Sequence, residues 1–225
     1  MFQLGRRVLD LDVGIGVGRA AVATRRTAPP LLLLACLATV GCDDDDSGFM
    51  KYVSIRYGGF ELGSANEING LTLGGVGSDT EIHHVQVSYS FDDSYEWFGG
   101  NCDMDYLVVM GGLDDVFDCD FGHDGKHQFG FCLRDPDYSD LEGEANGWEC
   151  DSYKPSGLTP PITDPTFANC TIIGPEYNDG MVGNLPPGHA FEYGACIRRA
   201  ARTEFFAIRY FHRHLDGKEL GARGA

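Results

Sequence analysis

Six acidic side chains recur with the same spacing in two neighbouring stretches of the chain, 22 residues apart. They are Asp92, Asp93 and Glu96 in the first stretch, and Asp114, Asp115 and Asp118 in the second. If the two stretches stack, like charges lie about 5 Å apart and repel each other. Three arrangements would relieve this repulsion. The carboxylates could accept hydrogen bonds from backbone N–H groups in turns, bind Ca²⁺, or hold a proton and act as an acid, as in glycosidases.

The calcium hypothesis depends on this stacking alone. The spacing of an EF-hand loop does not occur in the chain. Residues 74–79 match Gly-Gly-x-Gly-x-Asp once, but Glu81 stands where the nonapeptide of calcium-binding solenoids has an apolar residue, and the pattern does not recur. Ca²⁺ takes six to eight oxygen ligands, which two stacked acidic trios could supply. We therefore keep Ca²⁺ as a candidate cofactor beside the hydrogen-bonding interpretation.

Three aromatic residues lie beside the first acidic trio: Tyr95, Trp97 and Phe98. They could form a platform on which sugar rings stack, while the nearby carboxylates bond to hydroxyl groups. The competing interpretation places at least one of them in the hydrophobic core. A second group, His83 and His84, lies in a predicted strand, whose successive side chains point to opposite faces. These two histidines are therefore not expected to bind one ion together.

The acidic trios belong to a longer internal repeat. Residues 81–100 (EIHHVQVSYSFDDSYEWFGG) align without a gap with residues 103–122 (DMDYLVVMGGLDDVFDCDFG). A period of 20–50 residues indicates a solenoid, propeller or array. Apolar residues alternate within each unit and turn residues follow, so each unit contains strands. A propeller blade needs roughly 40–45 residues, and the consensus positions of a leucine-rich repeat are missing. The repeat predicts an all-β, right-handed parallel β-helix with coils of about 22 residues.

The core of the unit, apolar-x-x-apolar-x-apolar, recurs outside the paired stretches. The further matches are Met50/Val53/Ile55, Ile68/Leu71/Leu73, Phe167/Cys170/Ile172 and Phe205/Ile208/Tyr210. They place a β-helix domain of five or six coils over residues 50–211. Residues 137–166 and 175–189 show no strand pattern and are expected to be long loop excursions. Residues 212–225 read as an irregular tail.

The composition of the N-terminal segment predicts an export signal rather than a part of the fold. Arg25-Arg26 precede an apolar run of roughly a dozen residues, which is too short to span a membrane. The run ends in Thr39-Val40-Gly41-Cys42, which resembles a bacterial lipobox. We expect residues 1–41 to be a lipoprotein signal peptide and Cys42 to carry the lipid. Residues 42–49 then form an acidic tether, because adjacent carboxylates repel and stay extended.

Six cysteines lie beyond the predicted lipidation site: Cys102, Cys119, Cys132, Cys150, Cys170 and Cys196. An even number in an exported protein suggests disulfides, and six cysteines allow 15 connectivities. No paired C-x-x-C occurs, which disfavours a zinc site. Cys102 follows one repeat and Cys119 lies in the next, so the two are plausible partners. Cys170 occupies a proposed core position and could instead be a buried free thiol.

The chain is strongly acidic, with 34 Asp and Glu against 17 Lys and Arg in its 225 residues. Such a surface repels nucleic acid and anionic lipid headgroups, and favours cations and neutral or basic partners. Nucleic acid is therefore excluded as a partner. The membrane is expected to be reached only through the lipid anchor.

Particular motifs carry a family resemblance over roughly residues 50–211. They are NGLTLGGVG, a V-Q-V strand, the turn DDSYEWFGG, and a later DDVFD. The chain resembles a group of secreted or surface bacterial lipoproteins with right-handed parallel β-helix character. This resemblance implies the fold and a place in the cell envelope, and it implies no activity. We expect a non-catalytic envelope lipoprotein whose β-helix surface binds a glycan or a protein. The alternative is a polysaccharide-degrading lyase or hydrolase on the same scaffold.

Overall fold

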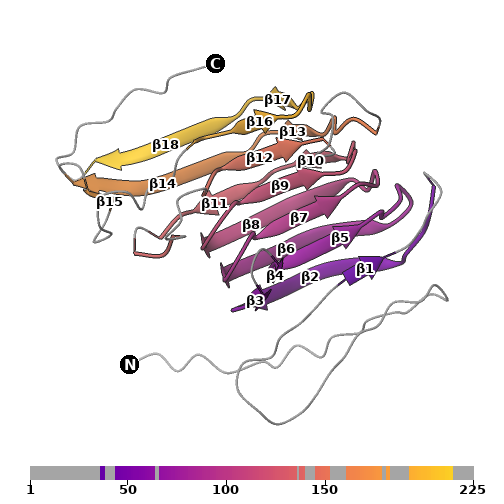
Figure 1. The fold of residues 1–225 in the computed structure, drawn as a ribbon, viewed down its shortest axis with the longest axis horizontal. Helices are drawn as coiled ribbons and strands as arrows, with labels where there is room; N and C mark the ends of the chain where they lie inside the picture. The colour runs from indigo at the N-terminus through magenta and orange to yellow at the C-terminus, as the bar shows by residue number, and fades with distance from the viewer. Residues whose placement is uncertain are drawn as a thin grey trace, which may run out of the picture.

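The computed structural model describes residues 36–38, 44–63, 66–135, 137–139, 145–152, 161–178, 181–182 and 193–214. Within these ranges the chain forms strands and turns, and contains no helix that could cross a membrane. The strands stack as the coils of one solenoid, from β2 at one end to β18 at the other (Figure 1). The predicted all-β parallel β-helix is confirmed.

One wall of the solenoid is a six-stranded, fully parallel sheet, here called sheet A. Its strands, in spatial order, are β1 (Cys36–Ala38), β5 (Leu71–Gly74), β7 (Tyr95–Phe98), β9 (Phe117–Asp120), β12 (Trp148–Asp151) and β16 (Cys196–Arg198). Each coil contributes one of these strands, so equivalent residues of successive coils lie side by side.

The rest of each coil belongs to a second sheet, sheet B, which is parallel except for the short strand β15. Three long strands open it: β2 (Phe49–Arg56), β6 (Glu81–Ser90) and β8 (Met104–Gly112). Pairs of shorter strands then replace each long one: β10 (Lys126–Gln128) with β11 (Phe131–Leu133), β13 (Thr166–Ala168) with β14 (Thr171–Asn178), and β17 (Glu204–Phe206) with β18 (Arg209–His214). β15 (Met181–Val182) pairs with β14, and β3 (Phe60–Gly63) forms a separate hairpin with β4 (Asn66–Ile68).

The predicted repeat fixes the register of the central coils. Val85 lies opposite Leu107 and Val87 opposite Val109, and all four are buried. The matches found at Met50, Phe167 and Phe205 also occupy equivalent rungs of sheet B. The prediction that Ile68/Leu71/Leu73 forms another equivalent coil segment was wrong. Leu71 and Leu73 belong to sheet A, whereas the other matches lie in sheet B.

In the repeated pattern apolar-x-x-apolar-x-apolar, two residues rather than one separate the first two apolar positions. A residue with left-handed backbone conformation in each coil explains this spacing. The residues at this point of the six coils all have φ between 53° and 58°: Tyr52, His84, Tyr106, Phe129, Asn169 and Ala207. A positive φ interrupts the alternation of a strand and turns the chain. Each long strand of sheet B is therefore bent, and the apolar residues on both sides of the bend point into the core.

Coil length varies between the central and the later coils. Val85 and Leu107 are 22 residues apart, whereas Cys132 and Ile172, which also pair, are 40 apart. The additional residues fall within the predicted excursion 137–166. That excursion was wrong in one respect, because it contains β12, a full rung of sheet A whose Trp148 lies against Phe117.

The two ends of the predicted domain also differ from expectation. The tether was predicted to be extended, but its second half is held against a turn. The Ser47 backbone N–H donates to the Thr80 hydroxyl oxygen at 2.9 Å, and the Glu81 N–H donates to the Gly48 carbonyl at 3.0 Å. At the other end, β18 continues to His214, beyond the predicted limit of residue 211. β1 lies within the predicted signal peptide, whose removal stays a prediction.

Candidate functional site

The outer face of sheet A gathers the acidic residues. Tyr95 and Trp97 point into the core, so the alternating residues Glu96 and Phe98 lie on the outer side of the sheet, where Glu96 is only 9% exposed and Phe98 is half-buried. In register with Glu96 lie Asp118 and then Glu149 on the next coils. Asp120 and Asp151 form a parallel row beside them. We call these five carboxyl residues, Glu96, Asp118, Asp120, Glu149 and Asp151, the acidic face.

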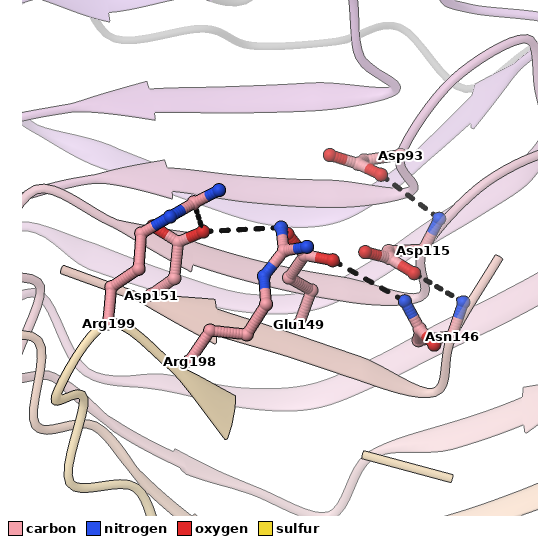
Figure 2. Close-up of polar contacts among 7 residues, drawn as sticks. All are labelled: Asp93, Asp115, Asn146, Glu149, Asp151, Arg198 and Arg199. Carbon is pink, nitrogen blue, oxygen red and sulfur yellow. Dashed lines mark hydrogen bonds and ion pairs between the residues drawn. The ribbon is translucent and has the colours of Figure 1, made fainter. Parts of the chain in front are cut away.

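A ladder of hydrogen bonds runs along the corner where each coil enters sheet A. The Asp93 Oδ1 accepts the backbone N–H of Asp115 at 3.0 Å, and the Asp115 Oδ1 accepts the N–H of Asn146. The Asn146 Oδ1 in turn accepts the N–H of Tyr193 at 3.2 Å. Figure 2 shows the first two of these steps. Of the three arrangements considered for the acidic trios, backbone capping is therefore the one observed for Asp93 and Asp115, and we call this series the corner ladder.

Two groups of three carboxylates remain close enough to hold a cation. One consists of Asp92, Asp93 and Asp114, and the other of Asp93, Glu96 and Asp118, with the ligand oxygens of each group within 4.8 Å of one another. Within the described chain, the Asp118 Oδ1 is buried without a hydrogen-bond partner. Oxygen-only groups of this kind suit Ca²⁺. Asp115 belongs to neither group, whereas Asp93 belongs to both and also serves the corner ladder.

Burial raises the pKa of the carboxyl groups in this region. The pKa of Glu96 rises to about 9, first because the group is buried and then because Asp92 and Asp120 lie nearby. The pKa of Asp115 rises to about 8, chiefly through burial and the charge of Asp114. Asp93 and Asp118 also have pKa values raised well above normal, again with burial as the first cause. At neutral pH the region therefore favours bound protons or a bound cation.

Arginines compensate the end of the acidic face that lies on β12. Arg198 pairs with Glu149 and lies 3.3 Å from the Asp151 carboxylate, and Arg199 also pairs with Asp151 (Figure 2). A third arginine, Arg134, is buried behind the corner and donates to backbone carbonyls, including that of Gly112 at 3.3 Å. The face thus runs from paired carboxylates on β12 to the crowded carboxyl groups of β7 and β9.

The aromatic platform predicted from the sequence is only partly present. Tyr95 and Trp97 are completely buried, so their assignment as sugar-stacking residues was wrong. Tyr95 stacks on Phe117 in the core, with ring centroids 5.7 Å apart. Phe98 does point outwards and is half-buried, and its ring lies 5.7 Å from that of the exposed Phe121. Phe98 and Phe121 are therefore the aromatic pair that borders the acidic face.

Of the predicted disulfide candidates, Cys102, Cys119, Cys132, Cys150 and Cys170 are buried free thiols, and Cys196 is half-buried. The suggested Cys102–Cys119 disulfide is not formed. Cys102 lies after the end of β7, while Cys119 lies on β9 opposite Trp97 and Cys150. Cys170 is buried below the bend of its coil, as a core thiol would be.

The structure also corrects the prediction for the two adjacent histidines. His84 has a φ of 54°, which breaks the strand alternation and turns its ring towards that of His83. Their Nδ1 atoms are 2.7 Å apart. They therefore lie together on the surface rather than on opposite faces.

A second histidine pair, whose burial the sequence did not reveal, lies inside the solenoid. His123 and His127 are fully buried, and their Nε2 atoms are 2.8 Å apart. The His123 Nδ1 lies 3.0 Å from the Gly100 carbonyl, so this nitrogen carries the proton and Nε2 accepts from His127. His127 takes the interior position that Met104 and Phe167 occupy on the neighbouring coils. The sequence signal for this burial is that His127 stands at a position of the repeat that is apolar in the neighbouring coils.

The sequence did not identify Asn146, Glu149 and Asp151 as residues of the candidate site. The signal was a repeat of the strand pattern, because WECD at residues 148–151 matches FDCD at residues 117–120 as aromatic-acid-Cys-acid. The intervening residues changed the spacing and concealed this match.

Comparison with known proteins agrees with this architecture. A family model for a pectate-lyase-like β-helix domain matches residues 38–190, which is more than half of the chain. No curated protein and no solved structure matches it. The chain therefore belongs to the family of pectate-lyase-like β-helix domains.

Proposed function

We propose that this protein binds a glycan on the acidic face without cleaving it. The observation that carries the proposal is the row Glu96, Asp118 and Glu149 on adjacent rungs, bordered by Phe98 and Phe121. Carboxylates accept hydrogen bonds from sugar hydroxyls, and phenyl rings cover the apolar face of a sugar. The regular rung spacing suits a ligand that is itself a repeating chain. A protein partner is the other ligand class that such a face would accept.

Binding is favoured over catalysis because two of the four carboxyl groups with raised pKa values lie out of reach of a substrate. Asp93 and Asp115 are at most 7% exposed and already accept backbone N–H groups. A general acid must reach the substrate within hydrogen-bond distance. These two side chains serve the corner ladder and are not placed to do so.

A polysaccharide-degrading enzyme is the second candidate, and one observation favours it. The pKa of Glu96 rises to about 9, so this group keeps its proton at neutral pH beside Asp118. A protonated carboxyl beside a second carboxyl is the arrangement that glycosidases use. The Asn69 amide donates to Glu96, which restricts its reach towards a ligand.

A glycan array combined with product analysis distinguishes the two functions. The binding proposal expects retention of an oligosaccharide that is recovered intact after prolonged incubation. Release of reducing or unsaturated ends would establish the enzyme instead, and Glu96→Gln would then abolish that release. If the protein retains no glycan on the array and releases no product, both functions are contradicted.

We further propose that the protein is exported and anchored in the bacterial cell envelope through Cys42. This cysteine lies outside the described residues, and the proposal is supported by the short apolar run and the lipobox-like Thr39–Cys42 sequence. Metabolic labelling with a clickable fatty acid should mark the wild type and not a Cys42→Ser variant. A labelled, membrane-bound Cys42→Ser protein would contradict the anchor.

A further inference from the structure

Two cysteines face each other inside the solenoid. Cys119 on β9 lies directly opposite Cys150 on β12, in a parallel register. Both are fully buried, and burial together with the neighbouring Cys150 thiol raises the pKa of Cys119 well above its ordinary value. Cys132, by contrast, has Val109 and Ile172 as its neighbours on the adjacent coils.

The backbone geometry between these two residues suits a covalent link. Neighbouring strands lie about 4.8 Å apart, and disulfides join Cα atoms that are about 4.4 to 6.8 Å apart. Cys119 and Cys150 occupy the same interior ladder, so their Cα–Cβ bonds point in the same direction into the core. Their Cβ atoms then lie about as far apart as the strands, slightly more than the roughly 3.5 to 4.5 Å that a disulfide joins, so a bond between these consecutive coils of sheet A draws the two strands together locally.

We infer that Cys119 and Cys150 form a disulfide between coils when the chain folds in an oxidising compartment. Two S–H bonds break and one S–S bond forms, while two electrons and two protons pass to a disulfide oxidant such as glutathione disulfide, which becomes two thiols. The bond must form during folding, because the folded core excludes the oxidant. The inference rests on the proposed export, since thiols in the cytosol are kept reduced.

The experiment is oxidative refolding of the purified full chain. The protein is reduced, denatured and refolded in a glutathione redox buffer, and the remaining thiols are alkylated in denaturant before non-reducing peptide mapping. The expected result is a cross-linked peptide pair containing Cys119 and Cys150, with Cys132 recovered alkylated. Reduction should then lower the melting temperature by roughly 10 °C.

Matched variants separate this bond from a general effect of reduction. Cys119→Ala should remove the sensitivity to reductant, whereas Cys132→Ala, at a buried thiol without a facing cysteine, should keep it. If Cys119→Ala does not fold, the peptide map of the wild type still shows whether Cys119 and Cys150 are cross-linked. Recovery of Cys119 and Cys150 as alkylated thiols, or of Cys119 linked to another cysteine, would overturn the inference. Refolding does not depend on glycan binding, so a chain that forms the bond and binds no glycan contradicts only the proposed function.

Discussion

Asp93 and Asp115 are joined across one coil of the solenoid, where the Asp93 Oδ1 lies 3.0 Å from the Asp115 backbone nitrogen. The same relationship is repeated from Asp115 to Asn146. An acceptor oxygen at this corner thus fixes the start of the next rung. The ladder needs that oxygen and not a charge, because an asparagine amide performs the same task at Asn146.

The first prediction separates hydrogen bonding from charge at this corner. Asp115→Asn keeps the acceptor oxygen, whereas Asp115→Ala leaves the buried N–H of Asn146 unsatisfied. We expect Asp115→Ala to lower the free energy of unfolding by about 1 to 3 kcal/mol. Asp115→Asn should preserve or raise it at pH 8. Urea denaturation measures both, and an equal loss in the two variants would refute the ladder as described.

The contribution of Asp115 to the pH dependence of stability has a defined sign. The pKa of Asp115 is about 8 in the folded protein, above its ordinary value near 3.8. The folded state therefore binds more protons between these values, and this residue makes stability fall as the pH rises from about 4 to 8. The stability difference between Asp115→Asn and the wild type should accordingly grow over this window. A difference that stays constant with pH would show that Asp115 is ionised in both states.

The buried histidines predict the opposite trend. Burial lowers the pKa of His123 to about 4 and that of His127 well below its ordinary value. The unfolded chain then binds more protons below about pH 6.5, so this pair makes stability fall as the pH drops from there towards 4. Each histidine can contribute up to about 1.4 kcal/mol per pH unit. His127→Met, which copies Met104 on the preceding coil, should show a shallower fall in denaturation experiments. A slope as steep as that of the wild type would contradict the neutral buried pair.

The carboxylate group Asp93, Glu96 and Asp118 predicts stabilisation by calcium. If the folded protein binds Ca²⁺ there, a concentration about 100 times Kd adds roughly 2.7 kcal/mol. Thermal melting in CaCl₂ and in EDTA should then differ by several degrees. Asp118→Asn should abolish the difference, and Asp105→Asn, at an exposed residue of sheet B, should keep it. Equal melting temperatures in CaCl₂ and EDTA would leave these carboxyl groups as proton-binding turn structure.

The fold was predictable because interior positions repeat at a fixed spacing in the central coils. Val85 and Leu107 fall in register by sequence alone, and the same six-residue pattern located three outer coils. It failed at His127, because a buried histidine does not match an apolar pattern. It also failed at Trp148, because inserted residues of variable length hide a rung whose partners are fixed only by the fold.

The candidate site was less predictable, since a sequence repeat shows which residues stack and not which way they face. Tyr95 and Trp97 are candidates for a surface platform as well as for the core when one coil is considered alone, but Phe117 and Leu73, their partners on the adjacent coils, are typical core residues. Reading all coils together would have placed both inside and left Glu96 and Phe98 outside. The arrangement of His83 and His84 could not be read from strand alternation, because it depends on the left-handed backbone at His84.

The most direct test of the account is the affinity of the best array oligosaccharide for two matched variants. Phe121→Ala removes an aromatic ring, 42% exposed, beside the acidic face, and Phe129→Ala removes one, 41% exposed, at the bend of sheet B. Isothermal titration should show at least about tenfold weaker binding for Phe121→Ala, equivalent to about 1.4 kcal/mol, and unchanged binding for Phe129→Ala. Unchanged binding by Phe121→Ala, or equal loss in both variants, would contradict the acidic face as the binding surface.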